Sequence, residues 1–355
     1  MNKLKVAIDS GPLTGGHSFR GIGFHTKLLI EHLKNNPNLS LDVIDFKKNT
    51  KFLKKEKFDV LHYPSFHPYF ISLPFVKYSK VVVTIHDLIP LIYPNKFPGG
   101  IKGKLKFFIQ KQLIKRVDAI ITISETSKKD ICRFLGVKPQ KVFVTHLSAR
   151  EKFKPITGKT LSNIQKKYNL PNKFVLYVGD VNYNKNIVRL ADACKMADLK
   201  LVIVGKQAAN NDFDRNHIEN EQLKELIAKY GNDKDILRIG FIEDDDLNAI
   251  YSLARVYCQP SLYEGFGLPV VEAFSCGLPV VAAKNNCLVE VADGAALFVD
   301  PTDVKDISQK LLEVSEDEEL RKDLIEKGFE RSKNFSWEKT ATKTFEVYKK
   351  VAQKS

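Results

Sequence analysis

Two glutamates eight positions apart flank a glycine-bearing turn in SLYEGFGLPVVEAFSCGLPVV, residues 261–281. Gly265 and Gly267 supply the turn, Glu264 precedes it, and Glu272 falls about one helical turn beyond it. A carboxylate in the position of Glu272 could accept two hydrogen bonds from vicinal hydroxyls, such as those of a ribose. Glu264 would face the group on the other side of a ligand held at the turn.

The backbone that follows the turn is expected to bind an anion. Pro269 suits a first helical position, because its missing N–H would be unpaired there in any case. The N–H groups of residues 266–269, with Phe266 and Leu268 among them, then point out of the strand end. Unpaired amides and the positive end of a helix dipole favour phosphate, and glycine permits close approach. A phosphorylated ligand is the first prediction.

A lysine follows another predicted strand in VLYVGDVNYNKN, residues 175–186. Gly179 ends the strand and Lys185 lies just beyond it. A lysine there is well placed to neutralise a diphosphate leaving group. The alternative is a solvated lysine at a helix start, since surface lysines are common.

The run from PSLYEGFGLP through EAFSCGLPVV to EVADGAALFVDP resembles the donor-site signature of retaining family 4 glycosyltransferases of the GT-B fold. Without that context, Glu264 and Glu272 would more often be two solvated carboxylates. The resemblance implies that Lys185 and the 266–269 amides hold the diphosphate and Glu272 the ribose. It also implies that Glu264 and His86, which follows the apolar run VVVTI, orient and stabilise the sugar.

Other positions match the family less closely. Gly21 and Gly23, with Arg20 ahead of them, resemble the loop that approaches donor phosphate and acceptor, although an ordinary turn is an open alternative. Family members usually carry an arginine immediately before the lysine, and here the residue is Asn184. Asn184 can donate a neutral hydrogen bond, but one of two expected diphosphate cations is missing unless Lys206 or an arginine of the first domain replaces it.

Neither a catalytic triad nor a metal cluster emerges from the sequence. The carboxylate run of residues 244–246 begins a predicted helix, where negative charge complements the dipole. No resident cofactor is expected, and the resemblance implies metal-independent transfer with retention at the anomeric carbon. The protein then acts mostly by electrostatic positioning.

The 355 residues suit two domains, and alternating strand and helix patterns predict an α/β fold with parallel sheets. By resemblance this is GT-B, with two Rossmann-like domains facing across a cleft. We expect an acceptor-binding domain over 1–165, a nucleotide-sugar domain over 172–335, and a helix over 336–355 that returns to the first domain. The predicted strands are 4–9, 58–64, 80–86, 119–124, 141–146, 174–179, 199–205, 236–241, 256–260, 278–283 and 295–299.

The net charge of +14 is divided unevenly. Residues 1–170 carry 31 basic and 11 acidic side chains, whereas residues 171–355 carry 25 and 31. Seven cations interleave with apolar residues in 95–116, which is typical either of a helix on an anionic membrane or of a core helix with a basic face. No nucleic-acid motif accompanies the charge.

These observations predict a hexosyltransferase that uses a nucleotide-sugar donor, with GDP-mannose preferred over UDP-hexoses, and a saccharide or lipid-linked acceptor. Five cysteines without a C-x-x-C pair and no long apolar run indicate the cytoplasm, with a peripheral place at the inner membrane. The alternatives are an epimerase or phosphorylase on the same fold and a catalytically silent sugar-nucleotide-binding partner. A dehydrogenase is disfavoured because Gly21 and Gly23 lack a third glycine.

Overall fold

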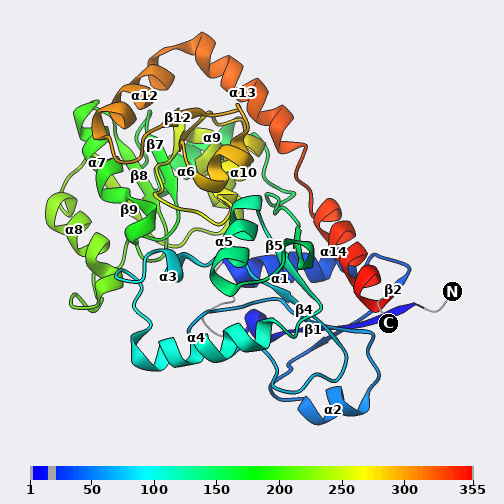
Figure 1. The fold of residues 1–355 in the computed structure, drawn as a ribbon. Coiled ribbons are helices and arrows are strands. Elements are labelled where there is room, and N and C mark those ends of the chain that lie inside the picture. The colour runs from blue at the N-terminus through cyan, green and yellow to red at the C-terminus, as the bar shows by residue number, and fades with distance from the viewer. Residues whose placement is uncertain (1–2, 15–20, 354–355) are drawn as a thin grey trace. The chain divides into compact units, whose positions relative to one another are not determined.

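The computed structural model describes residues 3–14 and 21–353, and the chain divides into two units (Figure 1). One unit contains the described residues up to Leu147 and from Ser336 onward. The other runs from Ser148 to Phe335. Each unit is built on a six-stranded sheet whose neighbouring strands are all parallel. The predicted α/β class with two Rossmann-like parallel sheets is confirmed.

The first sheet has the order β2-β1-β3-β4-β5-β6. Its central strands are runs of buried aliphatic residues, as expected where helices cover both faces. The strands are β1 (Leu4–Asp9), β2 (Leu39–Ile44), β3 (Val60–Tyr63), β4 (Lys80–Thr84), β5 (Ala119–Thr122) and β6 (Val142–Val144). The helices are α1 (Gly21–Leu33), α2 (Thr50–Lys55), α3 (Ile89–Ile92), α4 (Gly100–Ile114), α5 (Glu125–Leu135) and α14 (Trp337–Ala352), with 3₁₀ turns at Gly11–Leu13 and Pro139–Lys141.

Helix α14 returns to the first sheet, as the sequence predicts. Ser336 caps its start by accepting a hydrogen bond from Lys339 N, and α14 packs beside α1 and against β3, β4 and β5 (Figure 1). Trp337, Phe345 and Tyr348 are buried along its inner face. The Tyr348 hydroxyl lies 2.6 Å from His62 Nδ1, and His62 Nε2 lies 2.8 Å from Thr84 Oγ1. Three elements are therefore joined at one buried imidazole.

The second sheet has the order β12-β11-β10-β7-β8-β9. Its strands are β7 (Val175–Val178), β8 (Leu201–Val204), β9 (Ile236–Ile239), β10 (Val256–Gln259), β11 (Val280–Ala283) and β12 (Leu297–Val299). Its helices are α6 (Lys159–Lys167), α7 (Ile187–Met196), α8 (Glu221–Tyr230), α9 (Asp244–Leu253), α10 (Leu268–Ser275), α11 (Asn286–Ala292), α12 (Val304–Glu316) and α13 (Glu318–Ser332), with 3₁₀ turns at Tyr183–Lys185 and Ile218–Asn220. All six of these strands lie in segments that the sequence predicts to be strands.

The boundary between the units differs from the expected one. The sequence places it between residues 165 and 172, whereas the contacts divide the chain between Leu147 and Ser148. The segment after Ser148 is tied to α9: Asn248 Nδ2 donates to Lys152 O at 3.0 Å, and Ile156 N donates to Ser252 Oγ at 3.0 Å. These bonds join residues almost 100 positions apart and therefore leave no signal in the local sequence. The polar composition of the segment alone resembles that of a linker.

Strand β2 is absent from the sequence prediction. It pairs with β1 over its whole length, from Leu4 opposite Leu39 to Asp9 opposite Ile44. As an edge strand it is only partly buried, so its apolar pattern is weak. No helix among the described residues is long and apolar enough to span a bilayer.

Replacing Tyr348 by Phe should destabilise the first unit by about 1–3 kcal/mol, because the buried His62 Nδ1 loses its partner. Urea unfolding followed by the fluorescence of Trp337, the single tryptophan, measures this loss. The double variant His62→Leu with Tyr348→Phe removes both the imidazole and the hydroxyl. Its loss of unfolding free energy should be smaller than the sum of the losses in the two single variants. An unchanged unfolding midpoint for Tyr348→Phe would contradict this account.

Candidate functional site

The order of the second sheet reverses between β7 and β10, which pair directly through Val256 and Val175. Chain order runs outward from β7 through β8 to β9 on one side, and from β10 through β11 to β12 on the other. Ligands of open α/β sheets bind outside the carboxyl ends of the strands at such a reversal. The loops that leave β7 and β10 carry Lys185 and Glu264 respectively, so the topology brings two predicted residues together.

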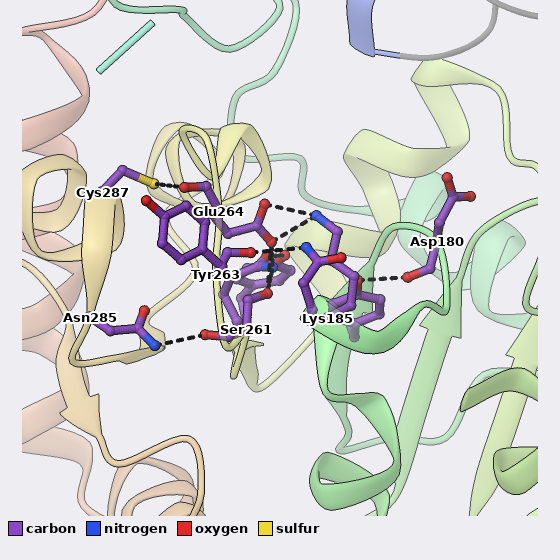
Figure 2. A network of polar contacts seen from close by, with 11 residues as sticks. Asp180, Lys185, Ser261, Tyr263, Glu264, Asn285 and Cys287 are labelled. Carbon is purple, nitrogen blue, oxygen red and sulfur yellow. Dashed lines mark hydrogen bonds and ion pairs between the residues drawn. The ribbon is translucent and has the colours of Figure 1, made fainter. Parts of the chain in front are cut away.

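Lys185 and Glu264 form a close ion pair (Figure 2). Lys185 Nζ lies 2.7 and 2.8 Å from the two carboxylate oxygens of Glu264. The glutamate is 6% exposed, whereas 23% of the lysine side chain remains accessible. The ammonium group has three donors, so it can be bonded to more than one acceptor at a time.

Two neutral donors hold the same carboxylate (Figure 2). Glu264 Oε1 accepts hydrogen bonds from Ser261 Oγ at 2.7 Å and from Gln259 Nε2 at 2.8 Å. Cys287 Sγ lies 3.1 Å from the Glu264 carbonyl oxygen. Both the side chain and the backbone carbonyl of Glu264 are hydrogen-bonded, so the carboxylate is held in one orientation. The alternative of a surface glutamate required a solvated carboxylate, which is not what the structure shows.

Asn184 and Asn186 hold the two loops together, and the sequence pattern had indicated only the first of them. Asn184, which is 2% exposed, donates to the Tyr263 carbonyl at 2.9 Å, while its own carbonyl accepts from Leu262 N at 2.7 Å. Asn186 Nδ2 donates to the carbonyls of Pro260 and Pro301. Asn184 thus supports the Glu264 loop at the position where the family usually has an arginine.

The glycine turn has the backbone conformation that the sequence predicts. Gly267 has φ +90° and precedes α10, which begins at Leu268 with Pro269 as its second residue. A Cβ on Gly267 would meet Leu288 Cδ2 at 2.6 Å, so sterics and φ both require glycine. Phe266 is buried and packs edge-on against Phe335. At the start of α10, Pro269 has no N–H and Val270 N donates to Gly267 O at 2.9 Å, so Leu268 carries the first N–H of the helix.

Gly179 and Gly205 allow the loops after β7 and β8 to approach closely. A Cβ on Gly205 would lie 2.2 Å from the Gly179 carbonyl oxygen, which leaves no room for alanine. Gly179 itself has φ +149°, and a Cβ on it would lie 2.8 Å from the Tyr177 hydroxyl. The predicted donor residue Gly179 therefore has a packing role that is visible without any ligand.

Glu272 lies inside the unit at 2% exposure, and both of its oxygens are engaged. Tyr251 OH donates to Oε2 at 3.0 Å, and Arg150 Nη1 donates to Oε1. Arg150 also pairs with Asp244, 3.2 Å from its Nε. Burial raises the pKa of Glu272, while Arg150 and the Tyr251 hydroxyl act in the opposite direction. The sequence did not identify Arg150, because nothing local marks it.

The aspartates of residues 244–246 begin α9, as predicted, and all three are paired. Asp244 contacts Arg150, Asp245 Oδ1 lies 2.8 Å from Lys152 Nζ, and Asp246 Oδ2 accepts from Tyr168 OH at 2.6 Å. These carboxylates attach the segment after Ser148 to the second unit.

In the first unit, His86 follows β4 and contacts His25 of α1, with His86 Nε2 3.1 Å from His25 Nδ1. Gly21 is exposed and Gly23 is buried at the start of the same helix, whereas Arg20 lies outside the described residues. His62 is a buried structural residue whose two ring nitrogens lie within hydrogen-bond distance of Tyr348 and Thr84. His25 was missed because its partner is 61 positions away.

Removing Arg150 should lower the unfolding free energy by about 3 kcal/mol at pH 7.5, the lower end for breaking a buried ion pair, because Arg150 is partly exposed. The pKa of Glu272 should then rise further above its unfolded value. Since the folded state then binds the proton more tightly, the deficit of Arg150→Ala should shrink as the pH falls toward 5. Urea unfolding followed by circular dichroism at both pH values tests this.

The control is Glu272→Gln in the Arg150→Ala background, which removes the uncompensated charge. This double variant should recover part of the stability at pH 7.5 and lose the pH dependence of the deficit. An equal loss of unfolding free energy in Arg150→Ala at both pH values would show that the loss does not come from the Arg150–Glu272 ion pair.

Two family models match the chain, and together they cover most of it. The model described as Glycosyltransferase Family 4 matches residues 19–147, and the model described as Glycosyl transferases group 1 matches residues 161–331. The matches lie on the first and second units respectively, and the second includes Lys185, Glu264 and Glu272.

Two relatives with similar sequences are named mannosyltransferases. O-antigen chain mannosyltransferase B of Escherichia coli is 30% identical over 307 residues, covering 84% of this chain and 76% of the relative. Serotype-specific mannosyltransferase WbdA of Escherichia coli is 29% identical over 78% of this chain, which spans only 34% of WbdA.

The Anabaena protein Alr3699/HepE, solved in complex with UDP and glucose, superposes with a TM-score of 0.72 at 16% identity, over 98% of this chain and all of that one. This likeness concerns the fold. The family models and the relative that is 30% identical carry the assignment, which agrees with the residues at the β7–β10 reversal. The chain belongs to the family 4, group 1 glycosyltransferases of the GT-B fold and is a glycosyltransferase.

Proposed function

We propose that this glycosyltransferase moves a hexosyl group, with mannose preferred, from a nucleoside-diphosphate sugar to a saccharide or lipid-linked saccharide, with retention. The Lys185–Glu264 pair at the β7–β10 reversal carries the proposal. It combines a partly accessible cation for a diphosphate with a carboxylate already oriented for sugar hydroxyls. Mannose is favoured because the relatives reported above are mannosyltransferases. GDP remains the preferred base, although UDP is what Alr3699/HepE binds.

In this mechanism the chain's own residues supply the electrostatics. Lys185 donates to the departing diphosphate, aided by the first amides of α10, which begins after Gly267. Glu272 receives the ribose hydroxyls; its two engaged oxygens do not prevent this, because a carboxylate has about four acceptor sites. Glu264 and His86 contact the hexose. The acceptor hydroxyl attacks the anomeric carbon from the face that the diphosphate leaves, as the bond to the diphosphate oxygen breaks, and the hydroxyl proton passes to that departing oxygen.

Metal-independent transfer is part of the proposal. Lys185 and backbone N–H groups at the start of α10 are the donors proposed to neutralise the diphosphate in place of a metal ion. The aspartates of residues 244–246 are each occupied by Arg150, a lysine or Tyr168, so they are not arranged as cation ligands.

The first test is release of GDP from GDP-mannose and of UDP from UDP-glucose, with and without EDTA. Lys185→Ala should lower kcat by about 100- to 1000-fold, the range for losing one donor that stabilises charge in the transition state. Lys305→Ala, which removes an exposed lysine of the same unit, should behave as the wild type. Nuclear magnetic resonance of the glycoside should show the α configuration of the donor.

Wild-type turnover by Lys185→Ala would refute the role of that lysine. Loss of activity in EDTA that Mg²⁺ restores would refute metal independence. A β-linked product would refute retention. Binding of either nucleotide without turnover would favour the silent-partner alternative.

We further propose that α4 rests on an anionic membrane, where a lipid-linked acceptor would lie. Ile101, Leu105 and Phe108 recur at positions i, i+4 and i+7, and they are 90%, 63% and 62% exposed. Lys102 and Lys104 lie exposed between them. The apolar residues that a core helix would bury thus face solvent beside cations, which is the composition of an interfacial helix.

The triple variant Ile101→Ser, Leu105→Ser, Phe108→Ser should bind phosphatidylglycerol vesicles at least about tenfold more weakly in co-sedimentation, because each side chain contributes about 1.5–3 kcal/mol when buried. Salt should weaken wild-type binding. The control Met196→Ser with Val289→Ser removes exposed apolar residues of the second unit and should bind as the wild type. Equal binding by the triple variant would refute the role of α4.

A further inference from the structure

Two buried histidines of the first unit contact each other directly. His25 Nδ1 lies 3.1 Å from His86 Nε2, and the rings meet edge to face, with centroids 4.7 Å apart at 87°. His25 is 1% exposed and His86 9%. Burial lowers the pKa of His86 to about 4 and that of His25 well below its usual value, so both rings are neutral at pH 7.

The two outer nitrogens of the pair lack partners. His86 Nδ1 and His25 Nε2 are buried without a hydrogen bond to any described residue. Leaving a buried polar atom unpaired costs about 1–3 kcal/mol, so an orphan on a nearly buried ring needs an explanation. His62 provides the contrast, because both of its nitrogens are bonded, to Tyr348 and Thr84. A structural histidine in this unit is fully satisfied, and this pair is not.

The contact between the rings determines what the outer atoms offer. A neutral imidazole has one N–H and one acceptor nitrogen, and one proton lies in the bond between the rings. Because Nε2 of His86 is committed to His25, Nδ1 is the atom left for a ligand. Trp337 packs on His25 with ring centroids 6.0 Å apart and is 1% exposed. The position of His25 is thereby held by α14.

We infer that His25 is a positioning residue that orients His86, so that the unpartnered His86 Nδ1 bonds a hydroxyl of the donor sugar. This inference rests on the proposed contact between His86 and the hexose. His25 itself touches no substrate; it holds the ring plane and selects the protonated nitrogen. If the proton in the shared bond belongs to His25, His86 Nδ1 carries a proton and donates; if it belongs to His86, Nδ1 accepts.

The test compares His25→Ala, His25→Asn, His86→Ala and the double alanine variant by kcat/KM for GDP release from GDP-mannose. The kcat/KM of His25→Ala should fall to within about threefold of that of His86→Ala. The double variant should have a kcat/KM no lower than that of His86→Ala, because the effects of residues that act as a unit are not additive. Asn can place a donor or acceptor where His25 Nδ1 was, so His25→Asn should recover most of the activity.

A second readout needs no turnover. In protein with ¹⁵N-labelled histidine, the His86 nitrogens should show one dominant tautomer in the wild type and in His25→Asn, and mixed protonation in His25→Ala. Tyr348→Phe is the matched control, since it removes a buried hydrogen bond of the same unit; it should lose stability but keep kcat/KM and the His86 signals.

The possible outcomes distinguish the positioning role of His25 from the proposed contact between His86 and the sugar. An impaired His86→Ala with a folded, fully active His25→Ala would overturn the positioning role and leave the sugar contact standing. Wild-type activity in His86→Ala would overturn the sugar contact itself. Equal loss in His25→Asn and His25→Ala, or unchanged His86 signals in His25→Ala, would show that the hydrogen bond is not what matters.

Discussion

The pairing of β7 with β10 is the constraint on which the candidate site depends. Because these strands are neighbours while their successors diverge, the loops after them meet at one edge of the sheet. Lys185 and Glu264, 79 positions apart, thereby reach hydrogen-bond distance. The loops are then fastened by Asn184 and Asn186, whose amides replace the backbone pairing that the strand ends no longer provide. The geometry of the pair is thus a property of the fold rather than of either loop.

Two nearly buried carboxylates in one unit are costly, and the structure compensates each in a different way. Glu264 is balanced by a cation that stays partly accessible and by two neutral donors. Glu272 is balanced by Arg150 and Tyr251 at greater depth. Burying ionised groups is rarely the most stable solution, since apolar residues of similar volume often do as well or better. The burial of these two carboxylates is therefore poorly explained by stability alone.

Sequence reasoning identified the elements whose signals are local. The turn at Gly267 was predictable because left-handed backbone favours glycine, and eleven strands were predictable from apolar runs between turns. Contacts through space were not. Arg150 reaches Glu272 across 122 positions and His25 reaches His86 across 61, and neither neighbourhood carries a motif. Strand β2 was missed because an edge strand is only partly buried and its apolar pattern is weak, whereas the division before Ser148 is set by distant contacts with α9.

Each unit has buried polar atoms without a partner among the described residues, and these atoms bear on what each unit binds. In the second unit the Glu264 carboxylate and the amide nitrogens of Asn184 and Asn186 are bonded internally, whereas two buried amide oxygens, those of Asn182 and Asn285, lack a partner among the described residues. In the first unit the His25–His86 pair has two unpaired outer nitrogens, and α4 exposes Ile101, Leu105 and Phe108 beside lysines. Both features are unfavourable in water alone and become favourable against a hydroxyl and a lipid surface. The first unit therefore has both polar and apolar groups that would gain from further partners, in keeping with its proposed role toward sugar and acceptor.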